Sequence, residues 1–306
     1  MRYREEVPEA LAGERLDRVV AMVTGCSRAE AAALIADGQV RVSGAVATSR
    51  SARVRLGDVV ELDAPEPGAV VELEPDPSVP VPVVHEDEHL IVVDKPAGLV
   101  VHPGAGRSAG TLVHGLLARY PELAGVGVDP ARPGIVHRLD KGTSGLLLVA
   151  RTPAAYEALV AMLAAREVHR RYRALAWGLV EAATGLVDAP IGRSSREPTR
   201  MAVVERGREA RTRYEVLRRY REPVEVTELA CTLETGRTHQ IRVHLRSIGH
   251  PVVGDVRYDG ARQSLPLDRP FLHAEVLELA HPVTGAPLRF ESALPEDLRA
   301  VLDRLR

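Results

Sequence analysis

The chain is poor in lysine, cysteine and aromatic residues. Lys95 and Lys141 are its two lysines, against 38 arginines, and aromatic residues make up 3% of the sequence. Cys26 and Cys231 stand alone without a CxxC spacing, which argues against a disulfide framework or a structural zinc site and fits a reducing compartment. The few aromatics argue against recognition of single-stranded nucleic acid by many stacked side chains.

Long apolar runs are also absent. No stretch approaches the ~18 residues that a membrane-spanning helix needs. The first 17 residues are charged and contain no apolar core of a signal peptide. We therefore expect a soluble, cytoplasmic protein without a membrane partner. A length of 306 residues with 45% hydrophobic content favours two domains with sizeable cores.

Positive charge is concentrated rather than widespread. The net charge of −2 argues against a uniformly basic nucleic-acid-binding protein. Residues 193–221, however, hold ten arginines against four acids, and residues 166–173 are also basic. Such runs are usually solvated surface, which is the better interpretation of the charge pattern alone, and binding of a polyanion is the alternative.

Residues 6–63 read as a small module. Apolar spacing predicts a helix after Gly13, and Ser27 with Glu30 forms a capping-box pattern at the start of a second helix. Short strands are expected at 40–42 and 59–62. The module resembles the S-four-like RNA-binding domain on the following segments: 15–17 (RLD), 27–31 (SRAEA), 38–44 (GQVRVSG) and 56–58 (LGD). The resemblance implies contact with structured RNA through Arg28 and Arg41, and a packing or dimerisation module is the alternative.

Residues 64–82 hold six prolines and several acids, which is typical of an extended, semi-rigid linker. The expected organisation is therefore a domain at 1–63, a linker at 64–82 and a second domain at 83–306.

The segment 134–150 places an acid on a sharp loop. Asp140 stands between Arg138 and Lys141, and the apolar run Leu146–Val149 that follows is typical of a strand buried on both faces. Rigidly held loops often carry chemistry. From the charge pattern alone, a structural acid that caps a turn and pairs with Arg138 is the better interpretation, and a reacting carboxylate is the alternative.

A basic strand and a basic helix follow. Tyr172 enters an expected strand at 174–177, and a helix at 241–248 would follow the turn 234–240. Three histidines stand in or near this helix (His239, His244 and His250), but without acid or cysteine ligands at the usual spacing we expect hydrogen bonding or packing rather than a metal site.

Four segments in order resemble the RNA pseudouridine synthases of the ribosomal large-subunit group, in the D-type branch with an N-terminal S-four-like domain. They are 94–103 (DKPAGLVVHP), 137–146 (HRLDKGTSGL), Arg170 with Tyr172, and 235–255 (from TGRTHQIRVH to GD). The resemblance implies an α+β protein: a small α/β RNA-binding domain, and a catalytic domain with a mixed, largely antiparallel sheet, flanking helices and a central RNA-binding cleft. It implies a monomer that acts on RNA, most often large-subunit ribosomal RNA.

The same resemblance implies roles for five residues. Asp140 is the expected essential acid, either as a nucleophile at C1′ or as a base at C2′ of the uridine. Arg242 is expected to pair with it, Tyr172 to stack on the uracil and Ile241 to pack against it. Arg138 is expected to fill the gap left in the RNA by the flipped base.

Three further residues, Arg237, His239 and Gln240, are expected to contact phosphates or neighbouring nucleotides. Because uridine and pseudouridine are isomers, neither a cofactor nor a metal is expected. Two alternatives stay open: an RNA-binding or ribosome-assembly factor in which catalysis is secondary, and a hydrolase that uses Asp94 with Asp140. Lys141 has no assigned role.

Overall fold

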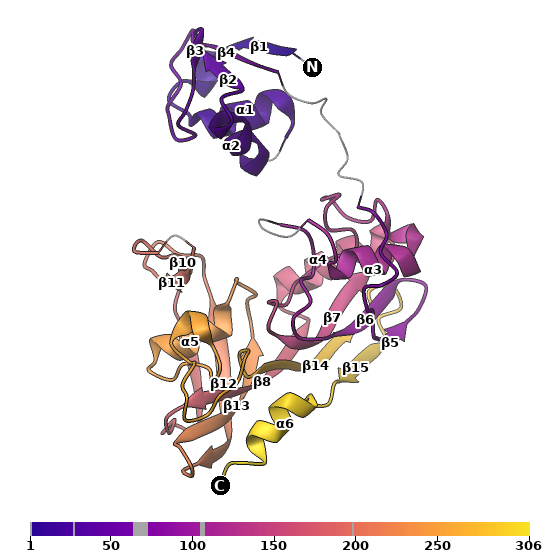
Figure 1. Ribbon diagram of the computed structural model, residues 1–306. Helices are drawn as coiled ribbons and strands as arrows, with labels where there is room; N and C mark the ends of the chain where they lie inside the picture. The colour runs from indigo at the N-terminus through magenta and orange to yellow at the C-terminus, as the bar shows by residue number, and fades with distance from the viewer. Residues whose placement is uncertain (1, 27, 64–72, 105–107, 198) are drawn as a thin grey trace. The chain divides into compact units, whose positions relative to one another are not determined.

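The protein divides into two compact units, Met1–Glu72 and Leu73–Arg306. The structure is a computed structural model, shown in Figure 1, and it describes residues 2–26, 28–63, 73–104, 108–197 and 199–306. Each unit is described by itself below.

The first unit is a four-stranded antiparallel sheet with two α-helices. The strand order is β1-β4-β2-β3, and Leu16, Val20, Ile35 and Val60 are in the core between sheet and helices. Helix α1 ends at Gly25, whose φ of 71° suits a glycine. The expected capping residue Ser27 lies outside the described residues. The elements are β1 (Arg2–Glu6), a 3₁₀ turn η1 (Glu9–Leu11), α1 (Leu16–Thr24), α2 (Arg28–Ala36), β2 (Val40–Val42), β3 (Ala45–Val46) and β4 (Val59–Asp63).

Part of the expected linker packs onto the second unit. Residues 64–72 are outside the described part of the chain, but 73–82 lie against helix α3 (Leu112–Arg119). The amide of Asp76 donates to the carbonyl of His114 (3.0 Å), and Val79 is buried. A Cβ on Gly115 would lie 2.8 Å from the Val79 carbonyl oxygen. The glycine lets an extended, proline-rich segment pack along the helix, so the second unit begins before residue 83.

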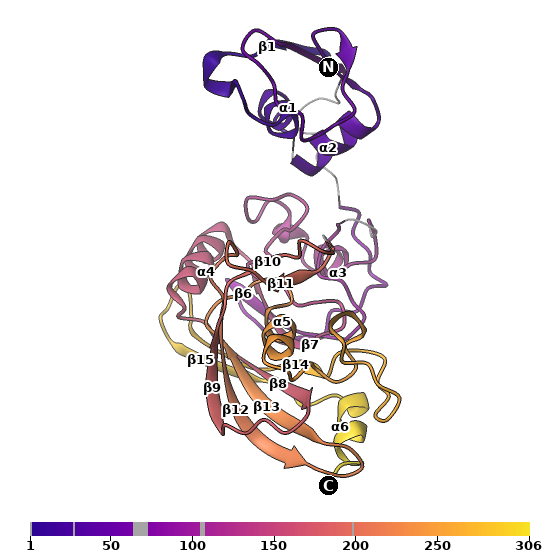
Figure 2. The ribbon, with the colours of Figure 1, turned by 90° about the vertical axis from the view of Figure 1, so that its left-hand side faces the viewer.

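The second unit is built on one mixed sheet with the order β5-β6-β7-β14-β8-β13-β12-β9, and β15 also pairs with β14. Strands β7 and β14 are parallel, and the other neighbours are antiparallel. The expected mixed, largely antiparallel sheet is therefore confirmed (Figure 2). Its strands are β5 (Val83–Glu86), β6 (Leu90–Lys95), β7 (Ser144–Ala150), β8 (His169–Trp177), β9 (Thr184–Asp188), β12 (Arg211–Tyr220), β13 (Val226–Leu233), β14 (Leu272–Ala280) and β15 (Pro287–Glu291).

Helices cover both faces of this sheet. Leu147 and Val149 of β7 belong to a core that includes α3, whereas Leu146 and Leu148 belong to another core with α4 (Pro153–Ala165). This explains the continuous apolar run in β7. Helix α5 contacts β12 at the other end of the sheet and the short ribbon beside it. The remaining elements are β10 (Ile191–Arg193) and β11 (Met201–Val203) of that ribbon, η2 (Pro121–Leu123), α5 (Gln240–Ser247), η3 (Val256–Tyr258) and α6 (Glu296–Leu302).

Within the described residues, no helix has the length and apolar character required to cross a membrane.

Candidate active site

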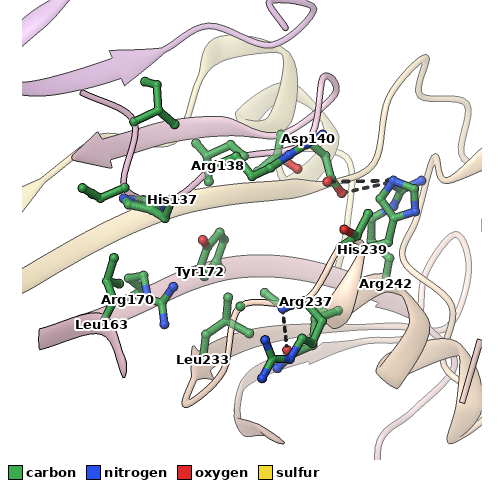
Figure 3. A pocket seen from close by; sticks show the side chains of 18 of the residues that line it. His137, Arg138, Asp140, Leu163, Arg170, Tyr172, Leu233, Arg237, His239 and Arg242 are labelled. Carbon is green, nitrogen blue, oxygen red and sulfur yellow. Dashed lines mark hydrogen bonds and ion pairs between the residues drawn. The ribbon is translucent and has the colours of Figure 1, made fainter. Parts of the chain in front are cut away.

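A cavity of about 540 Å³ opens on the second unit. It is bounded by the loop that precedes β7, by α4 and β8, and by the turn that leads into α5 (Figure 3). Among the described residues that line the cavity, Asp140 is the single carboxylate, whereas six are arginines. Positive charge therefore dominates the electrostatic potential of the cavity. The lining arginines are Arg132, Arg138, Arg170, Arg208, Arg237 and Arg242.

The loop that carries Asp140 is fixed from both sides. The carbonyl of Lys141 accepts a hydrogen bond from the amide of Gly98 (2.7 Å), and Nε2 of His137 accepts one from the amide of Leu148 (3.0 Å). Gly145 has a φ of 110°, and a Cβ there would lie 2.3 Å from the carbonyl oxygen of Ala274. Only glycine allows β7 to approach β14 this closely directly after the loop.

Asp140 is hydrogen-bonded to a buried arginine that a second carboxylate holds. Nη1 of Arg242 donates to Oδ2 of Asp140 (2.9 Å), while its Nε and Nη2 donate to the two oxygens of Asp255 (2.7 and 2.8 Å). Burial acts to lower the pKa of Arg242, but the hydrogen bonds of Asp255 and the charge of Asp140 outweigh it and raise this pKa. The bidentate pair fixes the guanidinium plane, which in turn fixes the direction of its bond to Asp140.

Asp255 is itself fixed by the backbone. It is fully buried, and its Oδ1 accepts hydrogen bonds from the amides of Arg257 and Tyr258 at the start of η3 (3.1 and 3.2 Å). The chain Asp140–Arg242–Asp255 therefore ends on the backbone of a helical turn rather than on a mobile side chain.

His239 approaches the other oxygen of Asp140. It precedes α5 with a φ of 58°, which is uncommon for a residue with a side chain. Nδ1 lies 2.7 Å from the hydroxyl oxygen of Tyr258, and Nε2 lies 3.9 Å from Oδ1 of Asp140. Burial lowers the pKa of His239 although the charge of Asp140 acts to raise it, so the ring is neutral at pH 7. The Tyr258 contact orients the ring toward the carboxylate.

Tyr172 and Ile241 supply apolar surface to the cavity. Tyr172 is 5% exposed and Ile241 is 3% exposed. Burial raises the pKa of Tyr172, so its hydroxyl keeps its proton at pH 7. Figure 3 shows Tyr172 of β8 across the cavity from the loop that carries Arg138 and Asp140.

Arg138 and Arg237 donate to neutral acceptors. Nη1 of Arg138 lies 3.3 Å from Nε2 of His102, and Nε of Arg237 donates to the carbonyl of Glu209 (2.9 Å). Burial, followed by the charge of Arg138, lowers the pKa of His102 to about 4, so this ring is a neutral acceptor. Arg138 is exposed at the cavity.

Gln240 differs from its expected role as an RNA contact. It is 3% exposed, and its Oε1 accepts from the Thr235 hydroxyl and the Arg237 amide. Its Nε2 donates to the Arg211 carbonyl and the Thr212 hydroxyl. All four hydrogen bonds that an amide side chain can form are thus made within the protein. Gln240 holds the turn before α5 in place and has no group left for RNA.

The residues expected at an RNA surface of the first unit are not part of this cavity. Arg41 is exposed on β2, and its Nη1 donates to the carbonyl of Gly44 (3.2 Å). Arg28 is the first residue of α2, and its side chain lies outside the described part of the structure.

The other two histidines near α5 are engaged in hydrogen bonds. His244 contacts the Thr212 hydroxyl and the Ala189 carbonyl (both 2.9 Å), and His250 contacts the Trp177 carbonyl (2.8 Å). Asp94 is not among the described residues that line the cavity, and it accepts a hydrogen bond from Ser292 (2.6 Å). The paired carboxylates of the hydrolase alternative are therefore not assembled there.

Lys95 is a supporting residue without an assigned role in the sequence analysis. It is fully buried, and its Nζ donates to the carbonyls of Pro96 and Leu99 (both 2.9 Å) and approaches that of Lys141 (3.5 Å). Burial lowers its pKa to about 7, with the charge of Asp140 acting in the opposite direction. The Nζ of Lys95 thus joins the loop after β6 to the loop of Asp140. The one feature of the sequence that could have indicated Lys95 is the scarcity of lysine, since it is one of two lysines against 38 arginines.

Sequence and structure comparisons agree on one family. Residues 89–247 match the family described as RNA pseudouridylate synthase, and residues 14–60 match the S4 domain. The chain is 45% identical to the ribosomal large subunit pseudouridine synthase D of Pseudomonas aeruginosa, over 98% of this chain and 95% of that protein. It is 44% identical to the protein of the same name from Xanthomonas campestris pv. campestris, over 98% and 91%.

Among solved structures, human RNA pseudouridylate synthase domain containing 1 matches with a TM-score of 0.58 at 28% identity, and it covers 78% of this chain and 90% of its own. The expected family and the expected S4 domain are confirmed. This chain belongs to the RNA pseudouridylate synthase family.

Proposed function

We propose that this protein isomerises specific uridines to pseudouridine in large-subunit ribosomal RNA, as a monomer in the cytoplasm. The observation that carries the proposal is Asp140, the single carboxylate among the described residues of the cavity lining, held by Arg242 in a cavity lined by arginines and by Tyr172. The names of the Pseudomonas and Xanthomonas relatives support the choice of large-subunit RNA. Every residue assigned below comes from one copy of the chain.

The reaction breaks the N1–C1′ bond, turns the uracil and joins C5 to C1′, while the hydrogen on C5 leaves and N1 gains one. Asp140 either attacks C1′ or removes the proton on C2′. Arg242 holds this carboxylate in place in both cases, because its Nη1 donates a hydrogen bond to Oδ2 of Asp140. Tyr172 stacks on the uracil during its rotation, Ile241 packs against it, and the Tyr172 hydroxyl assists proton transfer at C5.

The uridine must leave its stack before the carboxylate can reach C1′. Arg138, exposed at the cavity, takes the place of the flipped base in the RNA. Arg237 contacts a neighbouring phosphate, and His239, whose Nε2 lies 3.9 Å from Oδ1 of Asp140, contacts a neighbouring nucleotide. In the S4 domain, Arg28 and Arg41 contact structured RNA.

The test is to map pseudouridines in ribosomal RNA by carbodiimide-dependent primer extension. A strain without this protein should lose one or more stops, the wild-type gene should restore them, and a gene with Asp140→Asn should not. An unchanged map in the deletion strain contradicts the proposal. Full rescue of ribosome assembly by Asp140→Asn, without the modification, would instead favour the assembly-factor alternative.

A further inference from the structure

Strand β8 carries three arginines, Arg170, Arg171 and Arg173, which have unequal partners. Arg171 pairs with Glu275 (3.1 Å), and Arg173 pairs with Glu275 (2.9 Å) and Glu228 (3.4 Å). Successive side chains of a strand point to opposite faces, so Arg170 shares the face of Tyr172 instead. No carboxylate of the described residues pairs with Arg170. Acids of the neighbouring strands β13 and β14 therefore neutralise the two arginines on one face of β8. The third arginine, on the cavity face, has no acid among the described residues.

The arginine without an acid is also the buried one. Arg170 keeps 7% of its surface exposed, whereas the side chains of Arg171 and Arg173 are 46% and 30% exposed. Its Nε has no hydrogen-bond partner. Burial lowers the pKa of Arg170, but a guanidinium is never neutral in a protein. An uncompensated buried charge destabilises a fold by several kcal/mol unless a bound group neutralises it.

The surroundings of Arg170 hold this charge at the cavity. It lines the cavity together with Tyr172 and Gly236, and a Cβ on Gly236 would lie 3.1 Å from Nη1 of Arg170. The glycine thus leaves space for the guanidinium. Figure 3 shows Arg170 on the opposite side of Tyr172 from Asp140, next to Leu163. Arg170 and Tyr172 are two residues apart on one strand face, which is a separation of about 7 Å.

We propose that Arg170 binds a non-bridging phosphate oxygen of the RNA strand beside the uridine that occupies the cavity. The inference rests on the proposed function, since it takes RNA as the occupant. A phosphate carries a full negative charge and matches the planar fork of a guanidinium, whereas the uracil is neutral before the reaction. The phosphate supplies the negatively charged partner that Arg170 lacks in the free protein. Arg170 is therefore a binding residue of the cavity rather than a part of the sheet's framework.

The test measures release of tritium from a large-subunit ribosomal RNA transcript labelled with [5-³H]uridine, over a range of salt concentrations. Arg170→Met should raise KM about 10-fold or more, because a hydrogen bond to a charged group is lost, and should leave kcat within about 3-fold. The slope of log(kcat/KM) against log[salt] should become shallower by about 0.7–0.9, the value for one phosphate contact. Arg170→Lys should restore the slope but only part of KM, because it keeps the charge and loses the fork.

Arg171→Met is the matched control. It removes the same charge from the next residue of the strand, on the other face, and should leave the KM and the salt slope of the wild type unchanged. The thermal midpoint of Arg170→Met should be equal to or above that of the wild type, since an unpaired buried charge is replaced by an apolar group of similar length.

Two results would overturn the inference. A lower thermal midpoint with an unchanged KM and salt slope would make Arg170 a structural residue. A lower kcat with an unchanged salt slope would mean that the guanidinium of Arg170 interacts with the reacting uracil instead of a phosphate. Absence of tritium release by the wild-type protein is a separate result, which contradicts the proposed function itself.

Discussion

The buried arginines at the two ends of the cavity differ in whether a carboxylate of the protein neutralises them. At one end Arg242 is bound by two carboxylates, Asp140 and Asp255. At the other end Arg170 is buried without an acid among the described residues. The first arrangement is complete before any ligand arrives, which is what preorganised chemistry requires. The second is completed by an anion, which is what binding of a polyanion requires.

This difference predicts how substitutions divide. Changes at the Asp140 end should act on kcat, because they disturb a geometry used in the reaction. Changes at the Arg170 end should act on KM and on the salt dependence, because they remove charge that the RNA neutralises. The following substitutions test that division.

The largest effect is expected for Asp140→Asn. An amide neither attacks C1′ nor removes the C2′ proton, so kcat should fall by about 10⁴-fold or more, as is usual when a reacting group is removed. Tritium release under single-turnover conditions measures it. Asp94→Asn, at an acid outside the cavity lining, is the control and should stay within a few-fold of the wild type. Retention of even a tenth of wild-type kcat by Asp140→Asn would contradict the role of Asp140 as the reacting carboxylate.

A smaller loss is expected for Asp255→Asn. The substitution removes the charge that holds the Arg242 fork, and kcat should fall by about 10–100-fold with KM nearly unchanged. Because one partner of a buried pair is lost, the thermal midpoint should fall by about 10 °C. Asp259 lies four residues after Asp255 and pairs with Arg246 of α5 and, at 3.7 Å, with Arg200. Asp259→Asn weakens these exposed pairs and should change neither quantity.

Arg242→Lys distinguishes positioning from a loss of folding. It keeps a positive charge beside Asp140 but cannot hold Asp255 with two bonds in one plane. A low kcat at a thermal midpoint close to the wild type would support positioning by Asp255. An Asp255→Asn protein that is less stable but has a wild-type kcat would contradict it.

Tyr258→Phe should have a milder effect. It removes the hydroxyl that contacts His239 and accepts the amide of Met201 (3.1 Å), so the His239 ring loses its orientation toward Asp140. We expect a loss of about 3–10-fold in kcat, equivalent to a hydrogen bond of about 1 kcal/mol. The salt slope of kcat/KM should stay that of the wild type. A shallower slope would instead show that Tyr258 and His239 contribute to the charge-dependent binding of RNA.

Local patterns predicted the parts of the site that neighbouring residues specify. The apolar run of β7 and the helical spacing of α5 are visible in the sequence. The family motifs predict that Arg242 pairs with Asp140, and in the structure Nη1 of Arg242 lies 2.9 Å from Oδ2 of Asp140. Strand β14 was not predicted. Its sequence, LHAEVLELA, suits a helix as well as a strand, and its position is fixed by pairing with β7 and β8, which lie far away in the chain.

The supporting residues could not be read from spacing either. Asp255 stands in a matched motif, but only the fold shows that its carboxylate faces Arg242 of another element. The unequal environments of Arg170 and Arg171 are invisible in a run of basic residues, because the acids that neutralise Arg171 and Arg173 are on β13 and β14. Strand alternation predicts that the two faces differ, and the structure alone tells which face holds the acids.

The smallest effect at pH 7 is expected for His137→Gln, and it concerns acid stability at the Arg170 end. Burial, followed by the charge of Arg170, lowers the pKa of His137 to about 3 from 6.5, and its Nε2 already accepts the Leu148 amide. Between pH 6.5 and 3 the unfolded chain therefore binds a proton at His137 that the folded chain does not. The free energy of unfolding should fall with decreasing pH in this window, by at most about 1.4 kcal/mol per pH unit from this group. Glutamine keeps an acceptor for Leu148 but does not titrate, so urea unfolding from pH 8 to pH 4.5 should give a shallower acid decline. Parallel curves for the two proteins would mean that His137 is protonated in the folded state, and that the charge of Arg170 does not reach it.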